Sequence, residues 1–276
     1  MIFYTFLDLS GKVVLGIKIH FNMKILFVSS GTKKMFDLTG KNMISSFFHH
    51  NPDQKLLFTT ECYSFDNSKY NNLLQYDIMT YPFLLEWLEK FSYLIPTQFG
   101  GSYDHCTEKY SYMSPKTKNA VASGTWKGDW NYKASLWFRK IASLHYAYEI
   151  YKQQYDVIVW IDCDSTVNQS LANTSIQTLL NGKEFFCIFN IARLKHDYGI
   201  ESGFCGWRTD SNFLPDLFQK YISGAFELYS RWDDGYVIRK LIEESYVAKA
   251  HLIVSSNLVT HIKGIHWRTH TDYERD

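Results

Sequence analysis

The chain has 276 residues, of which 46% are hydrophobic, and its formal net charge is +1. This length and apolar content predict one large domain with a sizeable core, or a domain with an appendage. The balanced charge excludes a strongly basic nucleic-acid-binding protein, and no run of about 18 apolar residues predicts a membrane span.

Residues 1–22 precede a clean apolar strand, so we expect an N-terminal extension followed by a single domain over residues 23–276. Alternating apolar strands and amphipathic helices then predict the opening of a nucleotide-binding α/β domain. In this first half the expected elements are strands at Lys24–Ser29 and Lys55–Glu61 and helices at Phe36–Phe48 and Tyr81–Leu94.

Residues 95–132 interrupt this rhythm with a long stretch rich in Gly, Ser, Tyr, Trp and Asn. A loop of this length inside a compact domain is usually functional. The stretch is therefore a candidate lid or acceptor-binding segment, and a plain surface loop stays open as the alternative.

The central stretch of the chain is Val157–Ile161, an unbroken apolar run that ends in Asp162-Cys163-Asp164. Such a run predicts a strand buried on both faces, as in a parallel sheet. Two carboxylates where a buried strand emerges are costly unless something neutralises them, and the carboxyl ends of parallel strands are where α/β sheets bind ligands. A divalent cation carrying a phosphorylated ligand accounts for both carboxylates, although an ordinary polar turn is the simpler alternative.

The five cysteines are odd in number and include no CxxC pair, which indicates neither a zinc site nor a disulfide framework. Cys163 and Cys187 lie in apolar, strand-like segments and are predicted to be buried thiols. A reducing compartment suits this usage. Together with the missing membrane span, it leads us to expect a cytoplasmic enzyme of microbial or viral origin.

A long amphipathic helix is expected before the central strand, and helices and strands alternate after it. The expected helices are Asn131–Lys152, Asn173–Leu180, Ser211–Ser223 and Tyr236–Glu244, and the expected strands are Glu184–Phe189, Gly199–Arg208 and Ala248–Ser255.

Four short motifs, in this order, resemble those of GT-A nucleotide-sugar glycosyltransferases, nearest to the glycogenin and lipopolysaccharide galactosyltransferase group. The first is an aromatic pair and Arg, here Trp137-Phe138-Arg139, which leads into the Asp-x-Asp strand. The others are a Gly-containing strand around Gly203, an acidic pair at a helix start, and a closing His-x-x-Gly at His261 and Gly264. The resemblance implies a Rossmann-like α/β fold with a mostly parallel central sheet flanked by helices.

This sequence departs from the family pattern at two of the motifs. Glu201 stands where those families usually have Asn. The Lys-Pro pair of the closing motif is absent and Trp267 is displaced, so that Lys263, His266 or Arg268 could supply the missing charge. The departures leave open which positively charged side chain would bind the diphosphate of the donor.

The resemblance also implies roles for the residues that match. Asp164 and His261 would bind Mn²⁺, with Mg²⁺ as the alternative, and Asp162 would bind the metal or the ribose hydroxyls. Arg139 and Lys263 would add positive charge near the diphosphate, and Gly203 and Gly264 would let the backbone approach the donor. Three carboxylates would accept hydrogen bonds from hydroxyl groups of the sugar or the acceptor, namely those of Glu201, Asp233 and Asp234.

The function that follows is a metal-dependent transfer of a sugar from a nucleoside-diphosphate sugar to a hydroxyl of a glycan or another acceptor. A UDP-sugar is the first choice, by resemblance only. If the enzyme inverts, Asp234 is the expected base; if it retains, no separate base is needed. Two alternatives stay open: another metal-dependent phosphoryl- or nucleotidyl-transfer enzyme, and a carbohydrate-binding protein without activity on the same fold.

Overall fold

The structure is a computed structural model, which describes residues 2–7, 13–18, 23–90, 134–189, 199–223, 234–254 and 257–261. For residues 2–7, 13–18, 134–136 and 261 it describes the backbone and not the side chains. The expected loop 95–132 lies outside the described residues.

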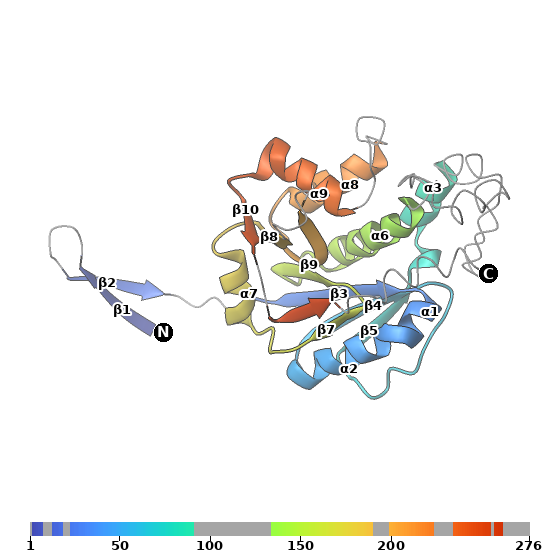
Figure 1. Cartoon of the computed structure of the whole chain (residues 1–276), viewed down its shortest axis with the longest axis horizontal. Coiled ribbons are helices and arrows are strands. Elements are labelled where there is room, and N and C mark those ends of the chain that lie inside the picture. Colours follow the sequence, from blue (N-terminus) through green and yellow to red (C-terminus); the bar gives the residue numbers. More distant parts are fainter. Residues whose placement is uncertain are drawn as a thin grey trace, which may run out of the picture.

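A seven-stranded sheet forms the centre of the protein, in the order β10-β8-β9-β6-β3-β4-β5 (Figure 1). Only β9 runs antiparallel to its neighbours in this sheet, β6 and β8, and every other pair is parallel. The expected α/β class with a mostly parallel sheet is confirmed. The strands are β3 (Ile25–Gly31), β4 (Lys55–Thr60), β5 (Leu73–Asp77), β6 (Val157–Ile161), β8 (Phe185–Phe189), β9 (Ile200–Arg208) and β10 (Ala250–Ile253).

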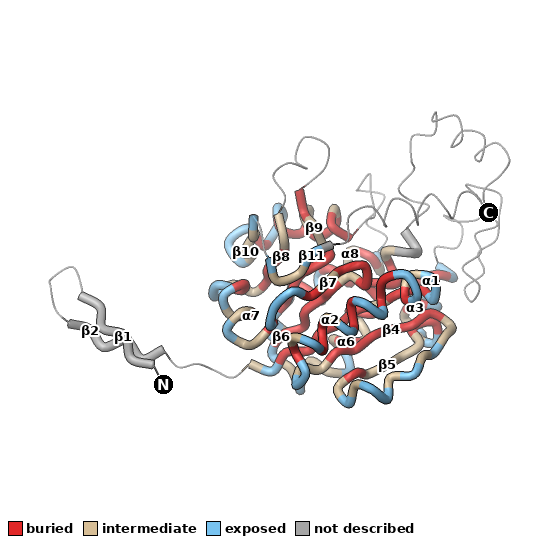
Figure 2. Tube along the Cα trace, turned by 60° about the horizontal axis from the view of Figure 1, so that its bottom comes forward, coloured by how far each residue is buried: buried red, intermediate tan, exposed pale blue. Residues whose placement is uncertain are grey.

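Helices cover both faces of the sheet because successive side chains of each strand point to opposite sides. On one face, Leu26 and Val28 pack in a core with α3 (Pro82–Lys90), α6 (Ala134–Tyr151), α8 (Phe213–Ile222) and α9 (Asp234–Leu241). On the other, Ile25 and Phe27 pack with α2 (Lys41–His50) and α7 (Asn173–Leu180). Figure 1 shows α6, α8 and α9 on one side of the strands and α2 on the other, and Figure 2 shows that the central strands are buried.

Two small sheets lie outside the large one. Strands β1 (Ile2–Leu7) and β2 (Val13–Lys18) pair with each other, within the predicted N-terminal extension. Strand β7 (Ser165–Val167) pairs with β11 (Val259–His261). The second of these sheets follows directly on the Asp-x-Asp turn.

The first expected helix differs from the observed structure. A short α1 (Lys33–Met35) and a π-helical segment (Phe36–Gly40) come before α2, which begins only at Lys41. The extra residue per turn lets Phe36 lie in the core beside Phe58. Strands β5 and β7 had no counterpart in the expected elements. Both are short or half-exposed, so their apolar pattern is weak.

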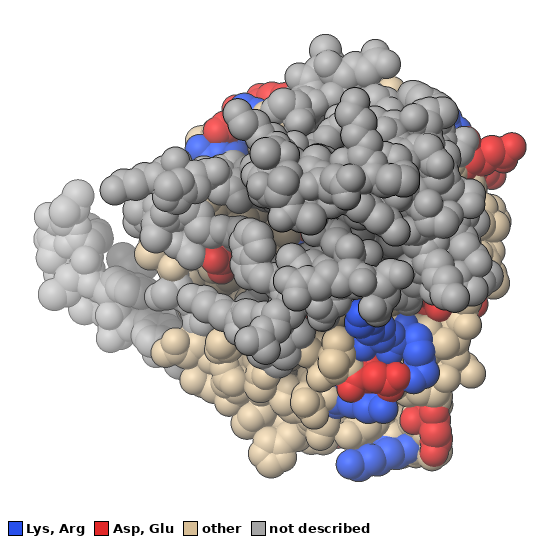
Figure 3. Space-filling view, turned by 45° about the vertical axis from the view of Figure 1, so that its right-hand side comes forward, with Lys and Arg blue, Asp and Glu red and all other residues tan. Residues whose placement is uncertain are grey.

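The described surface mixes charges of both signs. Figure 3 shows basic and acidic side chains side by side on the described part of one face. An example is Asp37, which forms ion pairs with Lys33 and with Lys41, the latter at 2.7 Å. A separate finding is that the described residues contain no helix of the length and apolarity that crossing a bilayer takes.

Candidate active site

The Asp-x-Asp turn lies at the carboxyl end of β6, whose five residues are all buried. The Asp162 N–H donates to the Gly203 carbonyl at 2.8 Å, and the Ser165 N–H donates to the Asp162 carbonyl at 3.1 Å. The Asp162 side chain is 29% exposed, whereas Asp164 is 4% exposed as a residue. The predicted strand, buried on both faces and ending in two carboxylates, is confirmed.

Cys163 points from this turn into the core, where it lies against Gly31 at the end of β3. Burial, followed by the nearby charges of Asp164 and Asp162, raises the pKa of the Cys163 thiol. A thiol buried in the core in this way has little thiolate character. Cys163 and Cys187 are both buried and free of disulfides, as the sequence predicts.

A lysine that the sequence analysis did not select joins the turn to the rest of the site. Lys140 Nζ, from α6, lies 3.3 Å from Asp162 Oδ1 and 2.6 Å from Asp234 Oδ2. It also donates to the Ser202 carbonyl at 2.6 Å. The Lys140 and Asp234 side chains are 9% and 8% exposed, so this ion pair is almost fully removed from water.

The charge on Lys140 is stabilised despite its burial. Burial works against the charged form, but the carboxylates of Asp162 and Asp234 outweigh it and raise the pKa of Lys140. The ammonium also lies 4.9 Å from the centre of the Trp160 ring, and the Trp160 indole N–H donates to Asp162 Oδ1. Lys140 therefore stays protonated and fixes two carboxylates that come from different parts of the chain.

Asp234 is the first residue of α9 and is buried there. A carboxylate in the first turn of a helix interacts favourably with the helix dipole. This end of α9 faces Lys140, so Asp234 contacts the same ammonium group that contacts Asp162. Its neighbour Asp233, also predicted as a site residue, lies outside the described residues.

The Gly-containing strand forms a bulge next to the turn. Its pairing with β8 jumps from Cys187–Cys205 to Ile188–Glu201, so the three residues Ser202, Gly203 and Phe204 form the bulge. Bulges re-aim groups beside functional sites. Here the bulge turns the Ser202 carbonyl to Lys140 and the Gly203 carbonyl to Asp162, and Glu201 directly precedes it in the chain.

The predicted third metal ligand lies on a strand that pairs with the segment after the turn. In the ladder between β11 and β7, His261 is the partner of Ser165, the residue after Asp164. Among the side chains that the structure describes, no three His, Cys, Asp or Glu residues form a group able to hold a metal. The His261 side chain lies outside that set, so the metal site stays a prediction.

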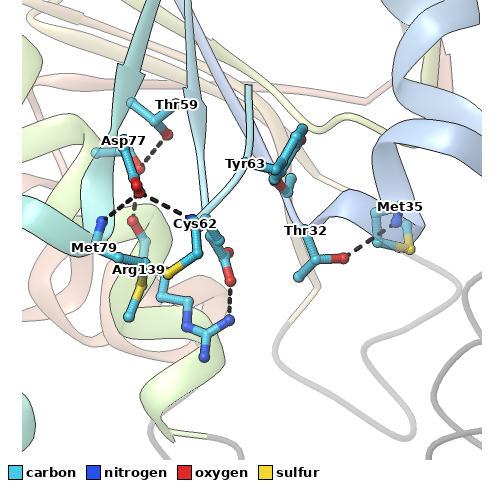
Figure 4. A network of polar contacts seen from close by, with 11 residues as sticks. Thr32, Met35, Thr59, Cys62, Tyr63, Asp77, Met79 and Arg139 are labelled. Carbon is cyan, nitrogen blue, oxygen red and sulfur yellow. Dashed lines mark hydrogen bonds and ion pairs between the residues drawn. The ribbon is translucent and has the colours of Figure 1, made fainter. Parts of the chain in front are cut away.

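Arg139 takes a different direction from its neighbour Lys140. Its guanidinium forms a buried ion pair with Glu61, with 2% and 4% of the two side chains exposed. Glu61 precedes Cys62, whose backbone is left-handed (φ 58°) and whose N–H donates to Asp77 Oδ1 at 3.0 Å (Figure 4). The role predicted for Arg139 near the diphosphate stays a prediction, and among the described side chains Lys140 is the cation that contacts the Asp-x-Asp turn.

The predicted site residues thus fall into three groups. Five of them lie where β6, the β9 bulge and α9 come together, namely Asp162, Asp164, Glu201, Gly203 and Asp234. Arg139 lies in the buried pair with Glu61. Asp233, Lys263, Gly264 and the side chain of His261 lie outside what the structure describes.

No protein-family model matches the sequence, and no curated protein matches it. Mouse xyloside xylosyltransferase 1 is similar in structure, at 12% identity and a TM-score of 0.49, over 83% of this chain and 84% of that one. The glycosyltransferase GlyE of Streptococcus pneumoniae TIGR4 is similar at 14% identity and a TM-score of 0.44, over 83% of this chain and 45% of that one. A glycosyltransferase involved in glycosylation of the major capsid of PBCV-1 is similar at 10% identity and a TM-score of 0.41, over 91% and 98%. At these identities the similarity concerns the fold alone.

Proposed function

We propose that this chain is a metal-dependent glycosyltransferase that moves a sugar from a nucleoside-diphosphate sugar to a hydroxyl of a glycan or another acceptor. The observation that carries the proposal is the meeting of two predicted site carboxylates on one ammonium. Asp162 ends the central strand and Asp234 opens α9, and Lys140 holds both at 3.3 and 2.6 Å. A UDP-sugar is the first donor to test, by the family resemblance.

The residues beside the turn suit a hard divalent cation. Asp164 is a buried carboxylate at a strand end, Asp162 is a partly exposed one, and His261 is the ladder partner of Ser165. Carboxylate oxygens with one imidazole suit Mn²⁺ or Mg²⁺. These three residues would hold the ion, which would supply neutralisation of the charge that develops on the leaving diphosphate.

Lys140 contributes a fixed positive charge to the same site. Because its pKa is raised and three oxygen atoms surround its Nζ, the ammonium keeps both its proton and its position. It contacts the carboxylates of both Asp162 and Asp234 and so holds the two beside each other. One ammonium between two carboxylates leaves these three residues with a net negative charge, which favours binding of a cation next to them.

Asp234 is the carboxylate best placed to accept a hydrogen bond from a hydroxyl group of the acceptor or of the sugar. Held by Lys140 and by its position at the start of α9, it needs no rearrangement to accept such a hydrogen bond. In an inverting reaction it would accept the acceptor proton as the base. In a retaining reaction it would steady the positive charge that develops on the sugar, and the proposal holds for either outcome.

The test is release of nucleoside diphosphate from a panel of UDP-, GDP-, CDP- and dTDP-sugars, with Mn²⁺, with Mg²⁺ and with chelator. We expect metal-dependent release from one donor. Asp164→Asn should lower it by about 10²-fold or more, since a charged ligand of the ion that would neutralise the leaving diphosphate is lost. Asp210→Asn is the matched control, because Asp210 is exposed and pairs with Arg208, which lies opposite Val157 at the other end of β6.

Equal metal-dependent turnover in Asp164→Asn and in the control would end the proposal for this site. Sugar binding without turnover of any donor, in a folded protein, would instead indicate a carbohydrate-binding protein.

A further inference from the structure

A hollow lies on the surface between α2 and β7, the strand that follows the Asp-x-Asp turn. Its volume is about 440 Å³, which is within the range of about 300–1,000 Å³ found for small-molecule sites. Figures 1 and 2 both show α2 and β7 next to each other along this surface. We call this hollow the α2–β7 groove.

The described lining of the groove consists of polar side chains and one apolar residue, Val167. Asn42, Ser45 and His49 lie on one face of α2 at helical spacing, and Thr166 and Asn168 line the opposite wall. No Lys, Arg, Asp or Glu is among the lining residues that the structure describes. Amides, hydroxyls and imidazoles both donate and accept hydrogen bonds, which suits a neutral ligand rich in hydroxyl groups and disfavours a phosphate or a peptide of high charge.

The imidazoles also offer flat faces. The His49 and His50 rings form an edge-to-face pair with centroids 4.7 Å apart at 79°. His49 is exposed on α2, so one of its faces is open to a ligand. Flat rings beside hydrogen-bonding groups are a combination that fits a sugar ring, which has an apolar face and a polar rim.

The walls of the groove are fixed to each other. The Val167 N–H donates to Ser46 Oγ at 3.0 Å, which joins β7 to α2. Asn168 Nδ2 donates to Thr260 Oγ1 at 2.8 Å, which joins β7 to β11. A groove held in this way loses little conformational freedom when it binds a ligand.

One residue that lines the groove lies close in sequence to the candidate active site. Thr166, which lines the groove, lies in β7 only two residues after Asp164, the residue that directly precedes this strand. A chain of sugars lying in the groove would therefore have one end close to the Asp-x-Asp turn.

We propose that the α2–β7 groove binds the uncharged oligosaccharide part of the acceptor. That the bound sugar is the acceptor rests on the proposed function, whereas sugar binding by the groove does not.

The experiment measures two things on the full chain. The first is equilibrium binding of fluorescently labelled neutral hexasaccharides built from glucose, xylose or galactose. The second is donor hydrolysis in water, which needs no acceptor. The variants are His49→Ala, which removes the exposed ring, and Ser45→Arg, which fills the groove. Thr178→Arg is the control, because Thr178 is an exposed hydroxyl residue on α7, away from the groove.

We expect at least one hexasaccharide to bind the wild-type protein. His49→Ala should raise its Kd by roughly 3- to 10-fold, the effect of losing one hydrogen-bonding or stacking contact. Ser45→Arg should raise the Kd by more than 10-fold, and Thr178→Arg should leave it unchanged. Donor hydrolysis should stay at the wild-type rate in all three variants.

The inference is overturned if no neutral hexasaccharide binds, or if binding is equal in Ser45→Arg and Thr178→Arg. Failure of the proposed function would look different. Hexasaccharide binding would still depend on Ser45 and His49, but no donor would be turned over by the wild-type protein.

Discussion

Lys140 and Asp234 form an ion pair with an Nζ–Oδ2 distance of 2.6 Å, although 94 positions separate them in the sequence. Both side chains are more than nine-tenths buried, so if one of them is removed, the charge of the other stays largely out of contact with water. The pair connects the helix before the central strand to the first residue of α9. The position of α9 over the end of the sheet therefore depends on this contact.

Replacing Lys140 tests both stability and turnover. Lys140→Met leaves the buried Asp234 carboxylate without its ammonium, and we expect a loss of about 3–5 kcal/mol in the free energy of unfolding. Donor turnover should fall by about 10²-fold or more. Lys152→Met is the control directly after the end of the same helix, because Lys152 pairs with Glu149 where both side chains are partly exposed. Equal urea midpoints for the two variants would contradict the structural role given to Lys140.

The Arg139–Glu61 pair should behave as a unit in a double-mutant cycle. Arg139→Met leaves a buried Glu61 and should cost about 3–5 kcal/mol. Glu61→Leu in the same chain should recover much of that loss, since an apolar pair of similar volume needs no desolvation of charge. Urea unfolding of the single and double variants measures the coupling, and strictly additive losses would show that the two side chains do not depend on each other.

Stability should fall on mild acidification because of His145. Its ring stacks on Phe83 with centroids 3.8 Å apart, and its Nδ1 lies 2.7 Å from the Tyr81 hydroxyl. Burial lowers the pKa of His145 below its usual value of about 6.5, so the unfolded chain binds this proton more readily than the folded one. The stability contributed by the neutral ring is therefore present above about pH 6.5 and is lost as the pH falls below it.

The measurement is urea unfolding between pH 5 and 8 for the wild type and His145→Gln. We expect the difference in unfolding free energy between the two proteins to shrink as the pH falls. A difference that stays constant over this range would show that His145 is not the group responsible.

Gly206 is needed for the packing of β9 against β8. A Cβ atom at this position would lie 2.2 Å from a ring carbon of Phe186, which is fully buried. Gly206→Ala should therefore cost about 1–3 kcal/mol, the usual effect of overpacking a core. Phe186→Leu added to Gly206→Ala should return part of the stability by making room. Thermal unfolding measures both, and no loss in the single variant would contradict the close packing.

The strands of the large sheet that are buried on both faces could be predicted from the sequence, because a short, continuous run of β-branched and aromatic residues favours a strand with neither face open to water. The run Val157–Ile161 is the best example, and the turn that follows it lies where the sequence predicts. Strand β5 was not predicted because it is an edge strand with four partly exposed residues, so its pattern is mixed. Strand β7 is three residues long, too short to give any pattern.

The choice between Arg139 and Lys140 shows where sequence reasoning ends. Successive helical residues are turned by about 100°, so neighbouring cations on α6 cannot face the same site. Which of the two faces the Asp-x-Asp turn depends on how α6 is rotated against the sheet. That rotation is set by packing with α3, α8 and α9, which come from distant parts of the chain. The Glu61–Arg139 contact, across 78 positions, is equally a product of the fold.

The ladder between β7 and β11 has a consequence for the order in which the protein is made. All strands of the large sheet precede β11 in the chain, so a growing polypeptide has every strand of that sheet before His261 has been synthesised. The segment after the Asp-x-Asp turn lacks its pairing partner until then. A nascent chain can thus complete its main sheet while the proposed ligand set is still incomplete, and the proposed ion would find all three of its ligands only after His261 has been made.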